Sequence, residues 1–218
     1  MGKEYATVFR EAEGFYEEKK SKFIASVFHV TSEAEVQEKM EAVRKKYYDA
    51  RHHCFAYVLG ADKDKVKQSD DGEPQKTAGI PILNVINGEN ATDTLIVVTR
   101  YFGGTLLGTG GLVRAYTKAA QDGLKNACVF TKNPAMLLRI DLRYEDHNRL
   151  SRYFAEQELQ PVSVDFSDIV SVKIPVRLSE LEDFRNHITE CTQNKGIINE
   201  EGEVYFALID GKTVLFES

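Results

Sequence analysis

The alternation of apolar and polar residues predicts strands in the first part of the chain. We expect four of them, over residues 6–14, 20–30, 52–60 and 93–102. The first two are joined by a turn that we place near Gly14. The fourth is rich in β-branched residues and almost free of charge, which is typical of a buried central strand.

Apolar residues at helical spacing follow the second and the fourth of these strands. Ser32 and Glu35 form a capping box, and the residues after it predict an amphipathic helix over 33–47. A second helix is expected to follow the glycines that end near Gly111. Residues 61–76 are polar and rich in turn formers, so we expect an exposed, mobile loop there.

The pattern changes near Pro134, in the segment TKNPA, because proline disfavours helix and cannot donate a backbone hydrogen bond. We therefore expect two domains, over 1–133 and 134–218. Strands are expected in the second domain over 136–144, 162–167, 170–178, 205–210 and 213–218. Helices are expected over 145–158 and 179–193, the latter capped by Ser179. The resulting order, β-α-β-β-α-β, is that of a ferredoxin-like fold, and the fold class is α+β.

Charge and cysteine usage narrow the functional class. The net charge is −6, but residues 1–133 hold 19 Lys and Arg against 18 Asp and Glu, whereas residues 134–218 hold 9 against 16. An acidic total argues against coating of nucleic acid by the whole chain, yet leaves a local basic face in the first domain open. Three widely spaced cysteines, the lack of a secretory signal and the lack of an apolar run of membrane length predict a cytoplasmic protein without membrane association.

The segment VTRYFGGTLLGTGGLVRAYTKAA, residues 98–120, holds the main candidate site. A glycine-rich turn that leads into a helix exposes backbone N–H groups that can bind an anion. Threonine hydroxyls and two arginines can add hydrogen bonds to phosphate oxygens. The spacing matches neither the P-loop nor the dinucleotide fingerprint, so close packing of the helix against a strand remains an equal alternative. The candidate residues are Arg100, Gly103, Gly104, Thr105, Gly108, Thr109, Gly110, Gly111 and Arg114.

Two histidines and an acidic loop form a second constellation. On a strand, His52 and Cys54 share one face and His53 lies on the other. Together with the loop carboxylates of Asp70, Asp71 and Glu73, these side chains would hold a metal if they converge in space. The alternative, which we favour, is an acidic turn that makes local hydrogen bonds, so no metal and no cofactor is expected.

Basic clusters form a third group, namely Lys19, Lys20, Lys22, Arg44, Lys45, Lys46 and Arg51. With Tyr47, Tyr48 and Tyr101 nearby in the sequence, they suit single-stranded RNA.

Four segments resemble the signature blocks of the IMPACT family, which includes the bacterial YigZ-like proteins. They are KSKFIA, HHCFAYVLG, SDDGEPQKTAGIPIL and the glycine segment quoted above, within about residues 16–125. The resemblance implies a first domain like the second domain of ribosomal protein S5. It implies a ferredoxin-like second domain similar to the last domain of the translocation elongation factor, and an association with the regulation of translation. It implies no catalytic residues.

The leading hypothesis is a non-enzymatic protein that binds RNA or the ribosome. Its binding surface would comprise the glycine segment with Lys22, His52, Asp70, Asp71 and Glu73, and the acidic second domain would contact a protein partner. The alternative is an enzyme for a small phosphorylated or nucleotide-like substrate, with acid–base groups from the acidic loop, His52 or His53. A protein-interaction adaptor, in which the glycines only pack, is the third possibility.

Overall fold

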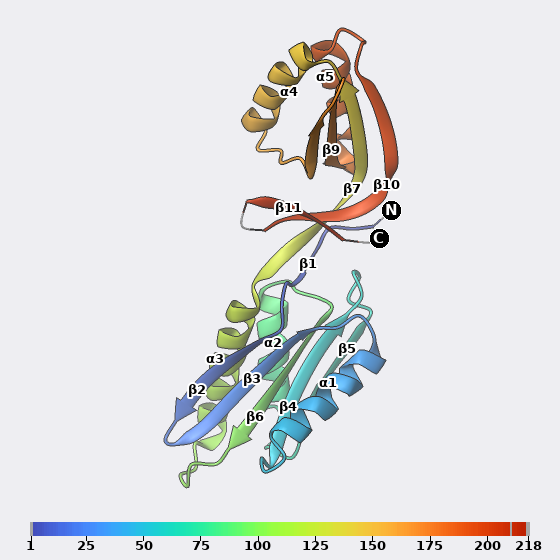
Figure 1. Cartoon of the computed structure of the whole chain (residues 1–218). Coiled ribbons are helices and arrows are strands. Elements are labelled where there is room, and N and C mark those ends of the chain that lie inside the picture. Colours follow the sequence, from blue (N-terminus) through green and yellow to red (C-terminus); the bar gives the residue numbers. More distant parts are fainter. Residues whose placement is uncertain (1, 210, 217–218) are drawn as a thin grey trace. The chain divides into compact units, whose positions relative to one another are not determined.

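The structure is a computed structural model that describes residues 2–209 and 211–216. The chain forms two compact units (Figure 1). One spans Tyr5–Thr131, and the other combines the residues up to Glu4 with the chain from Lys132 onward. Each unit contains a mainly antiparallel sheet covered by helices, which confirms the α+β class. No helix among the described residues has the length and apolar content needed to cross a bilayer.

The first unit, Tyr5–Thr131, contains a five-stranded sheet in the order β2-β3-β6-β4-β5. Its strands are β2 (Ala12–Glu18), β3 (Ser21–His29), β4 (His52–Leu59), β5 (Lys65–Ser69) and β6 (Thr94–Tyr101). Its helices are α1 (Glu33–Lys46), α2 (Gly79–Gly88) and α3 (Gly108–Ala127). A short strand, β1 (Tyr5–Val8), precedes them and pairs with β7 (Val129–Leu142).

Strand β6 lies at the centre of this sheet and contributes to a core on each face. Leu95 and Val97 pack on one face with the apolar residues of α1. Ile96 and Val98 pack on the other face with α2 and α3. Because both faces are covered, every residue of β6 from Thr94 to Arg100 is buried, and the buried central strand expected from the sequence is confirmed.

Two expectations for this unit are wrong. The turn between the first strands lies at Lys19 and Lys20, whereas Gly14 lies inside β2. A Cβ at Gly14 would come within 2.1 Å of the backbone nitrogen of Gly123, so the glycine is there because α3 crosses β2 closely. The polar segment 61–76 is also not wholly a loop, because β5 forms within it as an exposed edge strand paired with β4.

The second unit contains the strand order β11-β10-β7-β9-β8. Its strands are β7, β8 (Ser163–Phe166), β9 (Val170–Arg177), β10 (Ile197–Ile209) and β11 (Lys212–Phe216), and its helices are α4 (Tyr144–Glu156) and α5 (Leu181–Cys191). The expected pairing of the last two strands is confirmed.

Pro134 lies within β7, so no linker interrupts the chain there. A 3₁₀ turn, Leu178–Glu180, precedes α5, which has no side-chain cap, so the predicted cap at Ser179 is wrong. Asp210 and residues 217–218 of the expected strands lie outside the described residues.

Candidate functional site

Several segments meet at one end of the sheet in the first unit. Strands β3 and β4 begin there, at Ser21 and His52, and β6 ends there at Tyr101. The strand pairing places Lys22 opposite Tyr101 and His52 opposite Arg100. Residues far apart in the sequence, including most of the predicted binding set, are therefore neighbours at this end.

The glycine segment turns from β6 into α3, and α3 starts at Gly108 inside it. The residue before the helix, Leu107, provides no side-chain cap. Gly108, Thr109 and Gly110 are all exposed. The first N–H groups of a helix have no partner within it, so these exposed residues carry three amides without an intrahelical partner at the positive end of the helix dipole.

The glycines serve different purposes along this turn. A Cβ at Gly103 would come within 2.1 Å of the backbone carbonyl carbon of Lys20, so this glycine permits close packing against the β2–β3 turn. Gly104 and Gly108 have φ values of 86° and 70°, which favour glycine. A Cβ at Gly110 would meet no atom within 4 Å. Packing therefore explains the start of the segment but not Gly110, beside which the structure leaves open space.

Arg100 is not an exposed cation beside this turn. Its side chain is only 8% exposed, and its Nη1 donates a hydrogen bond to Oε1 of Glu73 at 2.6 Å. The guanidinium carbon lies 5.5 Å from the ring centroid of Phe23 and 5.7 Å from that of Phe102. The Nε atom is buried and has no hydrogen-bond partner among the residues the structure describes. The guanidinium thus belongs to a buried ion pair that retains one unsatisfied donor.

Glu73 lies at the centre of a buried polar network. The hydroxyl of Tyr116, from α3, donates to the same Oε1 atom at 2.8 Å. The thiol of Cys54 lies 3.3 Å from that hydroxyl. Burial raises the pKa of both the Tyr116 hydroxyl and the Cys54 thiol well above their ordinary values. Cys54 is therefore a neutral thiol and not an activated nucleophile.

The other loop carboxylates also hold backbone groups in place. Asp70 accepts hydrogen bonds from the amides of Ala78 and Gly79 through Oδ1 and from the amide of Lys76 through Oδ2. Burial tends to raise the pKa of Asp70, but these amide donors outweigh burial and lower it. Asp71 accepts from the amide of His53. Asp70 thus caps the start of α2 from a distance in the sequence.

The two histidines lie on opposite faces of β4, as expected. The Nδ1 atom of His52 lies 2.8 Å from the carbonyl oxygen of Asp71, so this nitrogen carries the proton and Nε2 is left as an acceptor in the neutral ring. The Nδ1 atom of His53 lies 3.1 Å from Oγ1 of Thr99, and burial lowers the pKa of His53. Within the described part of the chain, no three His, Cys, Asp or Glu side chains are grouped as metal ligands would be.

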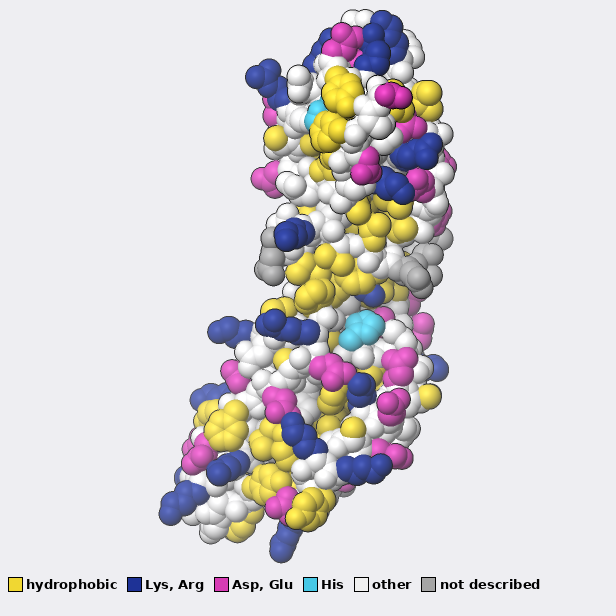
Figure 2. Space-filling view, viewed as in Figure 1, with side chains coloured by type: hydrophobic (Ala, Val, Ile, Leu, Met, Phe, Trp, Pro, Cys, Tyr) yellow, Lys and Arg dark blue, Asp and Glu magenta, His cyan; other side chains and the backbone are white. Residues whose placement is uncertain are grey.

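Exposed cations surround the glycine turn. Lys22, Arg51 and Arg114 are exposed and have no ion-pair partner among the described residues, and Lys19 and Lys20 are exposed at the β2–β3 turn. Figure 2 shows Lys and Arg side chains among hydrophobic ones at the end of the sheet where the arrowheads of β2 and β6 lie in Figure 1. These side chains, and not Arg100, provide the accessible positive charge.

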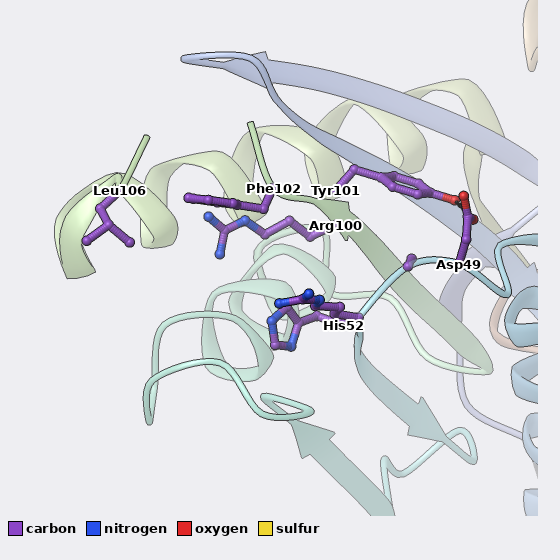
Figure 3. Close-up of a pocket in the computed structure, with 8 residues that line it drawn as sticks. Asp49, His52, Arg100, Tyr101, Phe102 and Leu106 are labelled. Atoms are coloured by element: carbon purple, nitrogen blue, oxygen red, sulfur yellow. Dashed lines mark hydrogen bonds between the residues drawn. The ribbon is translucent and has the colours of Figure 1, made fainter. Parts of the chain in front are cut away.

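A groove of about 500 Å³ opens between the glycine segment and the residues before β4. Its lining residues are Asp49, Ala50, Arg51, His52, Arg100, Tyr101, Phe102 and Leu106. Figure 3 shows the Phe102 ring over the Arg100 guanidinium, with His52 on the other side of that guanidinium. The Tyr101 hydroxyl donates to Oδ1 of Asp49 at 2.7 Å and closes one end of the arrangement.

Sequence reasoning missed the apolar part of this groove. Phe102 and Leu106 are 58% and 82% exposed, which is unusual for residues of this size beside a conformationally constrained turn. Phe102 falls at the end of the strand expected over 93–102, whereas β6 ends at Tyr101, so the periodicity gave no signal that its ring is exposed. Asp49 was missed for a different reason, because only the tertiary structure brings it next to Tyr101.

Comparisons with known proteins identify the family. The Impact N-terminal domain profile matches residues 19–124. The chain is 35% identical to IMPACT family member YvyE of Bacillus subtilis over 93% of each chain. It is 33% identical to YigZ of Escherichia coli, over 80% of this chain and 87% of that one. The chain belongs to the IMPACT family.

Relatives of this family also occur in eukaryotes and among solved structures. An IMPACT homologue of Dictyostelium discoideum is 41% identical, over 42% of this chain and 27% of that protein. A crystal structure of a hypothetical protein has 28% identity and a TM-score of 0.59, and it covers 93% of this chain and 100% of its own. The similarity to that structure extends over both units and supports the overall α+β architecture.

Proposed function

We propose that this IMPACT family protein binds single-stranded RNA, free or as part of the ribosome, and thereby modulates translation. The observation that carries the proposal is the exposed start of α3, where the amides of Gly108, Thr109 and Gly110 are uncapped among exposed cations. Helix N-termini of this kind suit phosphate oxygens. Nearby lysines and arginines add affinity through counterion release.

The domain folds implied by the family resemblance agree with this proposal. The second unit has the element order β-α-β-β-α-β, followed by one further strand, which supports a ferredoxin-like fold. For the first unit we propose the fold of the second domain of ribosomal protein S5. Both assignments link the chain to proteins of the translation machinery.

The charge distribution supports a division of labour between the units. The second part of the chain holds 9 basic residues against 16 acidic ones, so phosphate binding there is disfavoured. We propose that this acidic unit contacts a protein partner while the first unit binds RNA. The location of such a complex would be the cytoplasm.

The test replaces exposed cations and leaves the buried pair intact. We expect the variant with Arg51→Ala and Arg114→Ala to bind a short single-stranded RNA more weakly than the unchanged protein. The slope of log affinity against log salt should become shallower by about 0.7 for each phosphate that the variant no longer neutralises. Arg152→Ala removes an exposed cation in α4 of the second unit and is the matched control. Equal affinity and slope for all three proteins would contradict the proposal.

A second function, catalysis on a small phosphorylated or nucleotide-like substrate, is favoured by one observation. His52 lines the groove, and because its Nδ1 donates to the carbonyl oxygen of Asp71, Nε2 is the ring nitrogen left to accept a proton. The carboxylates of Asp70 and Glu73 are already engaged with protein donors, so His52 is the remaining candidate for a general base. Turnover of a nucleotide or sugar phosphate that is abolished in His52→Gln would establish this function. Turnover that is absent, or unchanged in this variant, would rule it out.

A further inference from the structure

The groove beside the glycine segment combines three kinds of contact that a nucleotide requires. It has an exposed aromatic face at Phe102, an apolar side chain at Leu106 and basic groups at Arg51 and Arg100. We propose that this groove binds one nucleoside phosphate unit, with its base stacked on Phe102 and its phosphate directed towards Arg100 and the start of α3. The proposal rests on the proposed function and names the chemical unit that the site recognises.

The aromatic contact is the first step of the argument. Phe102 is 58% exposed, while its ring already covers the Arg100 guanidinium on one side (Figure 3). The exposed part of the ring is therefore accessible to a planar group. Bases unstacked from a single strand bind proteins by stacking on such rings. An exposed phenylalanine held in place by a buried cation is a fixed platform for one base.

The unsatisfied donor on Arg100 is the second step. Its Nη1 is paired with Glu73, but the buried Nε has no acceptor among the described residues. A buried N–H group without a partner is destabilising, and Arg100 lines the groove. A phosphate oxygen that reached this donor would remove the penalty. Because Glu73 neutralises Arg100, the exposed Arg51 at the groove wall supplies the additional positive charge that a phosphate requires.

The size of the groove is the third step. Its volume of about 500 Å³ lies within the roughly 300–1,000 Å³ of small-molecule sites. This volume suits one nucleotide with an unstacked base, whereas the bases of a duplex are stacked and paired. The same chemistry can come from a free nucleotide or from one nucleotide of an RNA strand, and these two sources are separated by experiment.

A fluorescent variant tests the pocket directly. The chain has no tryptophan, so Phe102→Trp introduces a single reporter at the proposed stacking face. We expect adenosine monophosphate to quench this fluorescence with saturation, and ribose 5-phosphate to leave it nearly unchanged. The matched control is Phe15→Trp, since Phe15 is 52% exposed on β2 and does not line the groove. Absence of saturable quenching, or equal quenching in both variants, would overturn the proposal.

Binding by the unchanged chain provides the second measurement, which does not depend on the tryptophan. We expect calorimetry to show adenosine monophosphate binding that is roughly 5- to 150-fold weaker in Phe102→Leu, the range for stacking on one aromatic side chain. Phe102→Tyr keeps the ring and should retain the affinity. Equal affinity in the leucine variant would overturn the stacking contact even if all variants fold.

An RNA arm separates this proposal from the proposed function. A short single-stranded RNA is compared with an abasic strand that has the same number of phosphates. The abasic strand should bind more weakly. Equal, salt-dependent binding of both strands would retain RNA binding and overturn the nucleotide pocket. Binding of adenosine monophosphate but of neither strand would retain the pocket for a free nucleotide and overturn the RNA function.

Discussion

Substitution of Glu73 by glutamine tests whether the buried Glu73–Arg100 pair holds the site together. The two side chains are 4% and 8% exposed, and Glu73 also accepts the Tyr116 hydroxyl. Glutamine keeps the shape and an acceptor for Tyr116, but leaves the guanidinium charge uncompensated. Removing one partner of a buried ion pair costs about 3–5 kcal/mol, so we expect Glu73→Gln to lower the free energy of unfolding of this unit by about 3 kcal/mol.

The matched control is Glu11→Gln, which removes the same charge from an exposed pair. Glu11 is 57% exposed and pairs with Lys39 at 2.6 Å, and exposed pairs contribute about 0–1 kcal/mol. Hydrogen exchange at the amides of β6 reports on this unit alone, because β6 is its central strand. A decrease in stability below about 1 kcal/mol for Glu73→Gln, equal to that of Glu11→Gln, would refute the reasoning.

A double-mutant cycle identifies the cause of the destabilisation. Arg100→Met removes the cation and keeps much of the apolar stem, so the double variant with Glu73→Gln has no buried charge at this position. We expect the double variant to be more stable than the sum of the two single effects predicts, by about 2 kcal/mol. Simple additivity would mean that packing at each position, and not the charge pair, accounts for the two effects.

Three further predictions concern residues around the site. Asp70→Ala should cost about 2 kcal/mol, measured by denaturation against Asp70→Asn, because α2 loses its cap. Gly103→Ala should destabilise the unit, because the added Cβ would clash with backbone atoms. Gly110→Ala places its Cβ in open space within α3 and should be neutral or stabilising by up to about 1 kcal/mol. Equal effects of the two substitutions in thermal denaturation would contradict this prediction. The pKa of His53 is lower in the folded state, so the unfolded state binds a proton at this residue more readily. The contribution of neutral His53 to the free energy of unfolding is therefore complete above about pH 6.5 and decreases as the pH falls below that value. His53→Gln should flatten this slope, and an unchanged slope would exclude His53 as its source.

Periodicity predicted most of the secondary structure because burial of apolar residues is a local signal. The segment over 93–102 was recognised as a central strand since both of its faces are covered, and α1 was recognised from its capping box at Ser32, whose side chain accepts the amide of Glu35. The β2–β3 turn was misplaced because Gly14 resembles a turn residue, whereas only the packing of α3 explains it. Contacts of this kind between distant segments leave no mark in the local pattern.

The predicted binding surface included the cations Lys22, Arg100 and Arg114, of which the structure exposes Lys22 and Arg114 but buries Arg100. The sequence placed Arg100 among exposed phosphate ligands because nothing in the local pattern distinguishes a buried arginine from an exposed one. Its partner Glu73 lies in a loop 27 residues away. The exposed Arg51, which lines the groove, was not part of the predicted binding surface. The groove itself was not predictable, since Phe102 and Asp49 line the same groove only because β6 pairs with β4.

The most direct test of RNA binding at the start of α3 is an NMR titration of the isotope-labelled full chain with a short single-stranded RNA. The account predicts that the amide signals of Gly108, Thr109 and Gly110 shift with saturation, and that the shifts diminish as salt is added. Saturable shifts confined to the second unit, or the absence of shifts at these three amides while RNA binds, would contradict it.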